Sequence, residues 1–358
     1  MPRRLFGVAL VALLLAAAAA ADVTRTLRVE LSGDPAAGFA VENLAGTMKV
    51  TGGDVATVVA VATVHAEDAE LTDTVRFEQV TGKGDVATLR VRYPVERHSA
   101  FRYPGHGSSE TEYDGRRVKV SGSRGVLLWA EVTVTVPRGS VAGSFRNVVG
   151  PLEGSGLEGT LRFDTGSGEI TLTDVKGDIS ADTGSGEVTA ERLAGSFSCD
   201  TGSGACEVHG FDGDRLRCDT GSGKIRMDGV RALTVSADTG SGSIRLLDAD
   251  VEEFRADTGS GSIELEATGS RLTRVRADTG SGDLRVRLPA SASFAAKADQ
   301  GSGDLVCRFD DAQPIVSGRT VVGYRRADGR IRIDFDTGSG DLVIEPVTAG
   351  APAEAGRP

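Results

Sequence analysis

The stretch DTGSGSIRLLDADVEEFRADTGSGSIEL (238–265) decides the fold, because it contains two successive copies of a short repeat. The string DTGSG occurs eight times in the chain and its variant DQGSG once. The nine copies begin at Asp164, Asp182, Asp200, Asp219, Asp238, Asp257, Asp278, Asp299 and Asp336. Their spacings are 18, 18, 19, 19, 19, 21, 21 and 37 residues, so the last interval has room for one degenerate copy.

Apolar residues alternate with polar ones on both sides of each turn. In the quoted stretch they are Phe254 and Ala256 before the aspartate, and Ile263 and Leu265 after it. Apolar side chains spaced by two are typical of strands with one buried face. A unit of about 19 residues cannot bury such a face alone, whereas stacked copies enclose a continuous core. We therefore predict an all-β fold, a parallel β-solenoid of about ten coils over residues 145–346, with right-handed winding favoured.

The DTGSG string itself predicts a tight turn, and its nine aspartates are structural turn residues in this interpretation. Glycines such as Gly166 and Gly168 would supply backbone angles that a Cβ forbids. Each aspartate would accept a hydrogen bond from the amide two residues later. Because stacking places one carboxylate above the next, the column must be solvated, hydrogen-bonded or bridged by cations.

Four segments outside the regular repeats differ from them in composition. Residues 1–21, MPRRLFGVALVALLLAAAAAA, read as a secretory signal peptide, with an uncleaved membrane anchor as the alternative. Residues 22–144 are rich in strand-like runs and are predicted to cap the solenoid. Residues 310–336 are predicted to form a hairpin around Ala327–Gly329 that replaces one coil, and residues 347–358 a disordered tail. We expect an extracytoplasmic protein, whether periplasmic, secreted or on the cell surface, with no stable membrane span after signal removal.

Composition excludes several classes of protein. The formal net charge is −11 and no basic surplus is present, which argues against nucleic acid as a partner. Gly makes up 48 of 358 residues without a Gly-X-Y period, and 39% of the chain is hydrophobic. Neither collagen nor a disordered chain fits these values.

Two outward columns of the repeat carry cations. The candidate ligand face consists of Arg226, Arg245, Arg255, Arg276 and Arg285. Such rows could bind an acidic polysaccharide or the carboxylates of a partner protein. The alternative is ordinary solubilising charge.

Two further groups of residues raise the question of metals or disulfides. The loop 93–115 is either a ligand or metal contact or a plain surface loop. Its candidate residues are Tyr93, Tyr103, Tyr113, His98, His106, Glu110, Glu112 and Asp114. Cys199 and Cys218 occupy one inward column on adjacent coils, and are either a disulfide or small apolar core residues. No cysteine spacing fits a zinc site, and neither a metal site nor a cofactor is predicted.

Three segments carry a resemblance to a known family. VENLAGTMKVTGGD (41–54), AEVTVTVPRGS (130–140) and GSGEITLTDVKGDISADTGSGEVT (166–189) resemble the bacterial exported β-strand-repeat proteins labelled putative adhesins, a domain of unknown function. The resemblance implies the fold and export. It supplies no catalytic residues.

The favoured hypothesis for function is a non-catalytic exported solenoid with a structural or adhesion-like binding surface for an envelope or extracellular ligand, such as an acidic glycan or protein. DTGS is also the motif of aspartic proteases, but those enzymes need two facing loops, not nine at a coil period. The alternatives are a polysaccharide-active β-helix enzyme, a lyase or hydrolase, and an accessory protein in envelope stress sensing. An enzyme would need a unique acid–base cluster, and no catalytic residues are predicted.

Overall fold

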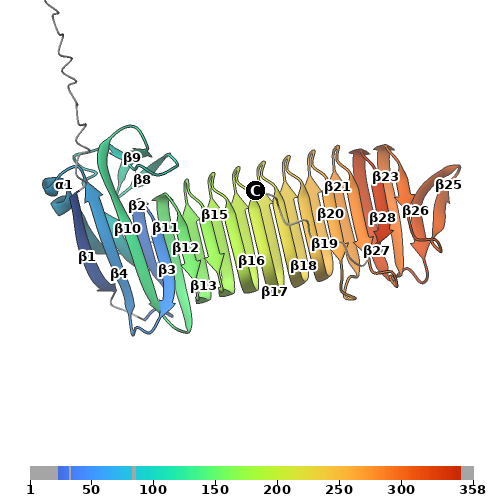
Figure 1. Cartoon of the computed structure of the whole chain (residues 1–358), viewed down its shortest axis with the longest axis horizontal. Helices are drawn as coiled ribbons and strands as arrows, with labels where there is room; N and C mark the ends of the chain where they lie inside the picture. The colour runs from blue at the N-terminus through green and yellow to red at the C-terminus, as the bar shows by residue number, and fades with distance from the viewer. Residues whose placement is uncertain (1–22, 32–33, 83–85, 348–358) are drawn as a thin grey trace, which may run out of the picture.

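A computed structural model describes residues 23–31, 34–82 and 86–347, which form a long rod of stacked strands with a broader N-terminal end (Figure 1). These residues contain 28 strands and one helix. The predicted all-β parallel β-solenoid is confirmed. The predicted signal peptide lies outside the described residues, as does the predicted tail from residue 348 onward. The hand of the winding stays a prediction.

The N-terminal part comprises β1 (Val23–Leu31), β2 (Phe39–Ala45), β3 (Met48–Gly53), β4 (Val58–Ala66), α1 (Ala69–Thr74), β5 (Arg76–Thr81), β6 (Ala87–Arg92), β7 (Ala100–Arg102), β8 (Ser109–Tyr113), β9 (Arg116–Ser121) and β10 (Val126–Pro137). The rod continues with β11 (Ser140–Val149), β12 (Leu152–Ser155), β13 (Glu158–Thr165), β14 (Ile170–Thr173), β15 (Lys176–Thr183), β16 (Val188–Thr201), β17 (Cys206–Thr220), β18 (Ile225–Thr239), β19 (Ile244–Thr258), β20 (Ile263–Ala267), β21 (Arg274–Thr279), β22 (Leu284–Leu288), β23 (Phe294–Ser302), β24 (Leu305–Cys307), β25 (Gln313–Ser317), β26 (Thr320–Arg326), β27 (Ile331–Ser339) and β28 (Leu342–Pro346). Within the described residues, no helix has the length and apolar composition needed to cross a bilayer.

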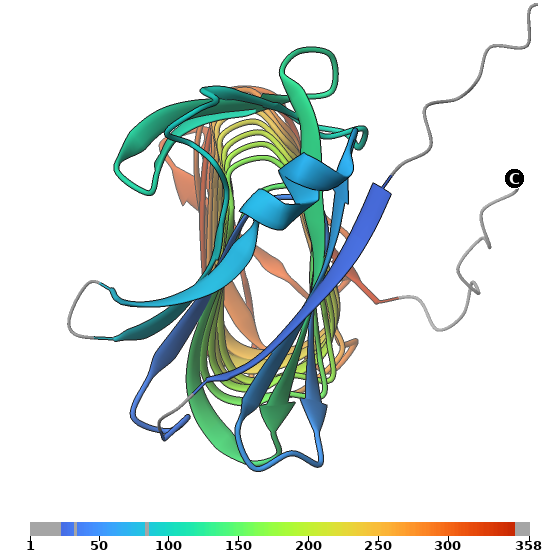
Figure 2. The ribbon, with the colours of Figure 1, turned by 90° about the vertical axis from the view of Figure 1, so that its left-hand side faces the viewer.

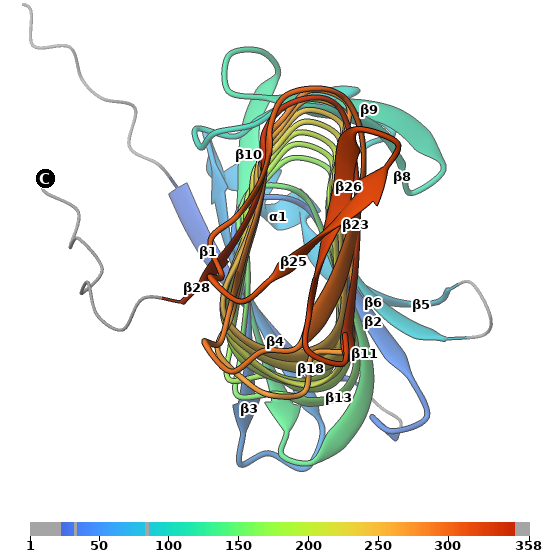
Figure 3. The ribbon, with the colours of Figure 1, turned by 90° about the vertical axis from the view of Figure 1, so that its right-hand side faces the viewer.

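Each coil runs along one wall of the rod, bends, and returns along the opposite wall, so the cross-section is a flattened oval (Figures 2 and 3). Strands β18 and β19 pair in parallel on both walls, from Ile225 opposite Ile244 to Thr239 opposite Thr258. Ile263 continues the ladder of Ile225 and Ile244, and all three are at most 2% exposed. Equivalent side chains therefore stack inside the rod, as the repeat predicts.

The core is the narrow space between the two walls. Ile244 and Leu246 point into it from one wall, and Phe254 and Ala256 from the other. A fully buried aliphatic or aromatic side chain stabilises the fold by about 1.5–3 kcal/mol. Since every coil repeats these positions, burial is distributed along the rod instead of being concentrated at one centre.

The turn is stabilised by threonine, and the role predicted for aspartate is wrong. Thr239 is 1% exposed, and its Oγ1 donates to the Gly223 carbonyl of the preceding coil at 2.9 Å. The same oxygen accepts a hydrogen bond from the Gly242 amide at 3.1 Å. The same pair of hydrogen bonds recurs at Thr183, Thr201, Thr220, Thr258 and Thr279. None of the nine aspartates in the described chain accepts the predicted bond, because their side chains point outward.

The glycines of the turn are required for a different reason from the one predicted. Gly242 lacks a left-handed φ, but a Cβ built on it would overlap the carbonyl oxygen of Gly223 on the preceding coil. Gly186 has the same relation to Gly168. Successive turns thus lie so close together that no side chain fits between their backbones.

The C-terminal coils are not stacked in chain order. Strand β27 lies between β21 and β23 and pairs in parallel with both. Strand β28 likewise lies between β22 and β24 on the other wall. The coil of Asp336 is therefore inserted between the coils of Asp278 and Asp299, and the coil made last in the chain is the second from this end of the stack.

The hairpin predicted around Ala327–Gly329 is also wrong. Strands β26 and β27 flank that turn, but they lie on opposite sides of β23, which pairs antiparallel with β26 and parallel with β27. The hairpin that does form is β25–β26, and it closes the rod beyond β23. Chain segment 310–336 therefore contributes both an end cap and the first strand of an inserted coil.

Parallel stacking extends on the N-terminal side of residue 145, where the sequence placed the start of the solenoid. Strand β2 pairs in parallel with β11, and β3 with β12. In these coils asparagine replaces the inward threonine of the turn. Asn147 follows Phe145 by two residues, just as Thr165 follows Phe163 in the next coil, and Asn147 pairs with Asn43. Strands β10, β4 and β1 then complete the end of one wall.

Candidate functional site

The nine aspartates form one column along an edge of the rod. Parallel pairing places Asp182 between Asp164 and Asp200, and Asp257 between Asp238 and Asp278. Partial burial, and then the neighbouring carboxylates, raise the pKa of Asp182 and Asp257. The column continues through Asp219, Asp336 and Asp299. In the described part of the chain, no group of three or more His, Cys, Asp or Glu is arranged to hold a metal ion.

The five arginines of the candidate ligand face do not share a face. Arg226, Arg245 and Arg285 lie in one ladder, where Glu264 separates the last two. Arg255 and Arg276 are direct neighbours in the ladder of the opposite wall. The turn between the two columns reverses the chain direction, so their outward side chains project from opposite sides of the rod.

On the first wall, the arginine side chains form ion pairs with neighbouring glutamates. Arg245 Nε lies 3.0 Å from Glu264 Oε2, and Arg285 Nε lies 3.8 Å from Glu345 Oε1. Arg287 contacts both glutamates, with 3.0 Å from its Nε to Glu345 Oε1. These guanidinium groups are largely occupied by neighbours within the sheet.

Two arginines on the second wall have no such ion pairs. Arg255 and Arg276 are exposed, and within the described residues neither forms an ion pair of 4.0 Å or less. Two shallow hollows, of about 350 Å³ and 440 Å³, lie on this wall and share Arg276. Arg274 borders the first hollow and forms an ion pair with Asp334 at 3.7 Å. The second hollow is largely acidic, since its lining contains Lys297 together with Asp278, Asp299, Asp334 and Asp336. This wall therefore offers adjacent guanidinium groups to a ligand from solution.

Three of the four cysteines, Cys199, Cys206 and Cys218, form a buried cluster. Cys199 and Cys218 are neighbours in one ladder, as predicted, and both are free thiols. The Sγ atom of Cys218, however, lies 2.9 Å from Sγ of Cys206, which projects from the opposite wall. Burial raises the pKa of Cys206 well above its usual value. The alternating pattern also directs Cys206 inward, but it does not predict that the two walls bring Cys206 against Cys218.

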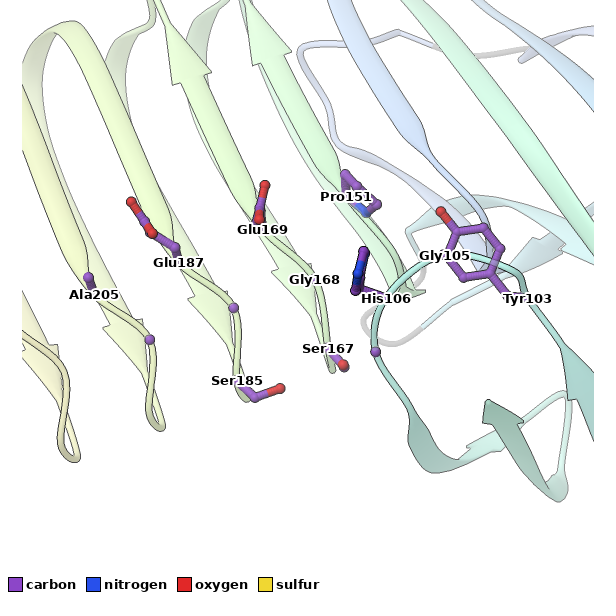
Figure 4. A pocket seen from close by; sticks show the side chains of 13 residues that line it. Tyr103, Gly105, His106, Pro151, Ser167, Gly168, Glu169, Ser185, Glu187 and Ala205 are labelled. Atoms are coloured by element: carbon purple, nitrogen blue, oxygen red, sulfur yellow. The ribbon is translucent and has the colours of Figure 1, made fainter. Parts of the chain in front are cut away.

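The loop 93–115 is divided between core and surface. The rings of Tyr93 and Tyr113 are buried, and their hydroxyl groups donate to the carbonyl oxygens of Ala45 at 3.0 Å and Val91 at 2.7 Å. Tyr103 and His106 instead reach the first turns of the repeat, where they line a groove (Figure 4). These two are among the eight loop residues that the sequence points to, but the sequence does not predict the coil residues that they meet.

Comparison with known proteins gives a family match over most of the repeat. The family model described as Toastrack DUF4097 matches residues 117–345. A search among curated proteins finds no match.

Several solved structures are similar to the chain. One is a putative adhesin from Parabacteroides distasonis ATCC 8503, at 14% identity, with 92% of this chain and 98% of that chain covered and a TM-score of 0.46. A putative adhesin from Parabacteroides merdae ATCC 43184 has 14% identity, 91% and 96% coverage, and a TM-score of 0.44. A protein described as putative lipid binding from Parabacteroides distasonis ATCC 8503 has 14% identity, 91% and 97% coverage, and a TM-score of 0.37.

Proposed function

The chain belongs to the Toastrack DUF4097 family, and from this premise we propose that it is a non-catalytic exported protein whose solenoid presents a binding surface for an acidic ligand in the bacterial envelope. The family membership confirms the resemblance seen in the sequence. The signal-like residues 1–21 support export.

One observation carries the proposal, namely the adjacent exposed guanidinium groups of Arg255 and Arg276. Strands in a parallel sheet lie about 4.8 Å apart, so the two groups can meet two acidic groups of one extended ligand. Guanidinium binds carboxylate through paired, charge-assisted hydrogen bonds. The hollow of about 350 Å³, lined by Arg255, Arg274 and Arg276 together with Glu253, gives such a ligand a surface to follow.

A binding role agrees better with this wall than catalysis does. A glycosidase needs two carboxylates flanking the bond to be cleaved, and a lyase needs a positioned base. The proposed surface consists of guanidinium groups on repeated coils. Such groups bind an acidic chain but do not abstract a proton at neutral pH, since arginine stays protonated.

The test is binding of the mature protein to a uronic-acid polymer. We expect saturable binding that falls by about tenfold or more in the double variant Arg255→Gln/Arg276→Gln, because two charge-assisted contacts are lost. The matched control is Arg226→Gln/Arg245→Gln, which removes the same charge from the opposite wall. Binding should also weaken as salt rises.

Two results would contradict the proposal. Equal losses in both double variants would mean that only overall charge attracts the polymer. Release of shorter oligosaccharides from the polymer during the assay would mean that the protein is an enzyme.

A further inference from the structure

Two thiols face each other across the core within a single coil of the rod. Cys206 begins β17 on one wall, and Cys218 lies 12 residues later in the same strand, where the chain has returned along the opposite wall. Their Sγ atoms are 2.9 Å apart, whereas nonbonded carbon atoms pack at about 3.5–4.0 Å. Both side chains are 0% exposed, so the two sulfur atoms meet inside the core.

Packing alone does not require cysteine at these positions. Val188 and Ile225 occupy the place of Cys206 on the two adjacent coils. Ala237 occupies the place of Cys218 on the next coil. Hydrocarbon side chains therefore fill the same space in the neighbouring coils. What distinguishes this coil is the chemistry that two adjacent thiols permit, namely the formation of a disulfide bond.

Cys199 is a poorer partner for Cys218 than Cys206 is. Cys199 and Cys218 are neighbours in one parallel ladder, where side chains point in the same direction and the strands stay about 4.8 Å apart. A disulfide requires Cβ atoms about 3.5–4.5 Å apart and side chains that are directed toward each other. Cys206 and Cys218 approach from opposite walls, so their side chains point toward each other. The geometry therefore selects this pair and leaves Cys199 as a thiol.

We propose that Cys206 and Cys218 form a disulfide bond in the exported protein, and that this bond ties the two walls of the coil together. Each thiol gives up its proton, and the pair gives up two electrons, as the sulfur–sulfur bond forms. The oxidant is a small-molecule or protein disulfide, whose own sulfur–sulfur bond breaks to give two thiols. Extracytoplasmic compartments allow such bonds to form and persist. The inference rests on export but not on ligand binding by the arginine wall.

The bond can form early and is then protected. Because both cysteines belong to one coil, the reaction needs no later part of the chain. Once the coils are stacked, both sulfur atoms are buried and out of reach of a reductant in solution. Closing the loop between the two residues also stabilises the folded protein, mainly by restricting the unfolded chain.

The experiment uses the mature protein, residues 22–358, directed to the periplasm of a bacterial host by a leader of that host. Free thiols are alkylated in denaturant, and fragments from an Asp-specific protease are mapped by mass spectrometry. Cleavage before Asp200 separates Cys199 from Cys206, so the two possible partners of Cys218 are distinguished. Cys218→Ala and Cys199→Ala are a matched pair of variants, because they make the same change at neighbouring buried positions of one ladder.

We expect alkylation of Cys199 and Cys307 only, and a linked fragment that contains Cys206 and Cys218. Reduction in denaturant followed by refolding with the thiols kept reduced should lower the midpoint of thermal unfolding by about 3 °C or more. This loss should persist in Cys199→Ala and disappear in Cys218→Ala.

Three results would overturn the proposal. They are alkylation of all four cysteines in the exported protein, a fragment that links Cys199 to Cys218, and an equal loss of midpoint on reduction in Cys218→Ala and the wild type. Mapping of the wild-type protein decides the first two even if a variant fails to fold. Binding of a uronic-acid polymer by a protein with four free thiols would overturn this inference and leave the proposed function standing.

Discussion

The threonine column gives the most direct test of how the rod is held together. Thr239→Val preserves the shape of the side chain but removes the hydroxyl that joins Gly223 to Gly242. Two buried backbone groups then lose their partner. Each such loss costs about 1–3 kcal/mol, so we expect a destabilisation of about 2–6 kcal/mol.

The assay combines thermal unfolding with amide hydrogen exchange. In a stacked repeat each coil contacts only its neighbours, so faster exchange should concentrate in β18 and the coils beside it. Thr239→Ser keeps the hydroxyl and should recover most of the protection. The matched control is Thr171→Val on the exposed side of β14, which should change stability by less than about 0.5 kcal/mol. Unchanged exchange in Thr239→Val would refute the role of the column, as would an equal effect of the control.

Three further predictions concern the turns and the thiols. Gly242→Ala should lower the midpoint of unfolding by more than the exposed neighbour Ser241→Ala, because its Cβ would meet the backbone of Gly223; equal midpoints would show that the turns can separate. For Asp182 the folded pKa is raised, so its contribution to stability is present below the unfolded pKa and is lost as pH rises through the folded pKa. Asp182→Asn should therefore raise the midpoint at neutral pH, with a gain that shrinks toward about pH 4, and melts at both pH values check it; a gain independent of pH contradicts the charge explanation. Oxidative refolding with oxidised glutathione as the disulfide donor should link Cys206 to Cys218, because their sulfur atoms lie 2.9 Å apart. Peptide mapping that found Cys199 joined to Cys218 would contradict this prediction.

Much of the fold can be predicted from the sequence, because the same alternation of apolar and polar residues flanks all nine copies of the turn. The inward positions of Ile225, Ile244 and Ile263 follow from alternation alone, and the structure confirms them. The same alternation also predicts that threonine points inward, since Thr279 is two residues after the buried Ala277. Aspartate is common in turns, but the period of two directs its side chain to the outer surface, where it does not bind the turn amide.

The order of the last coils could not be derived in this way. Coils with nearly identical turns are equally good neighbours, so the local pattern does not say that Asp336 lies between Asp278 and Asp299. One local signal does agree with the result. The variant DQGSG places Gln300 where the other copies have threonine, and this coil is the last of the nine in the stack.

The candidate sites depend on contacts that periodicity does not contain. The sequence predicts one arginine face from two columns, but these columns lie on opposite walls because each coil reverses direction between them. The groove depends on Ser108 meeting Ser167, a contact between segments 59 residues apart.

The inserted coil has a consequence for the order in which the protein can fold. As the chain is synthesised from its N-terminus, each coil up to that of Asp278 finds the preceding coil already in place. The edges of β21 and β22 then wait for residues 331–346, which arrive last. During that interval the growing end offers unpaired strands to other molecules, and chains interrupted before residue 331 should be the ones that aggregate.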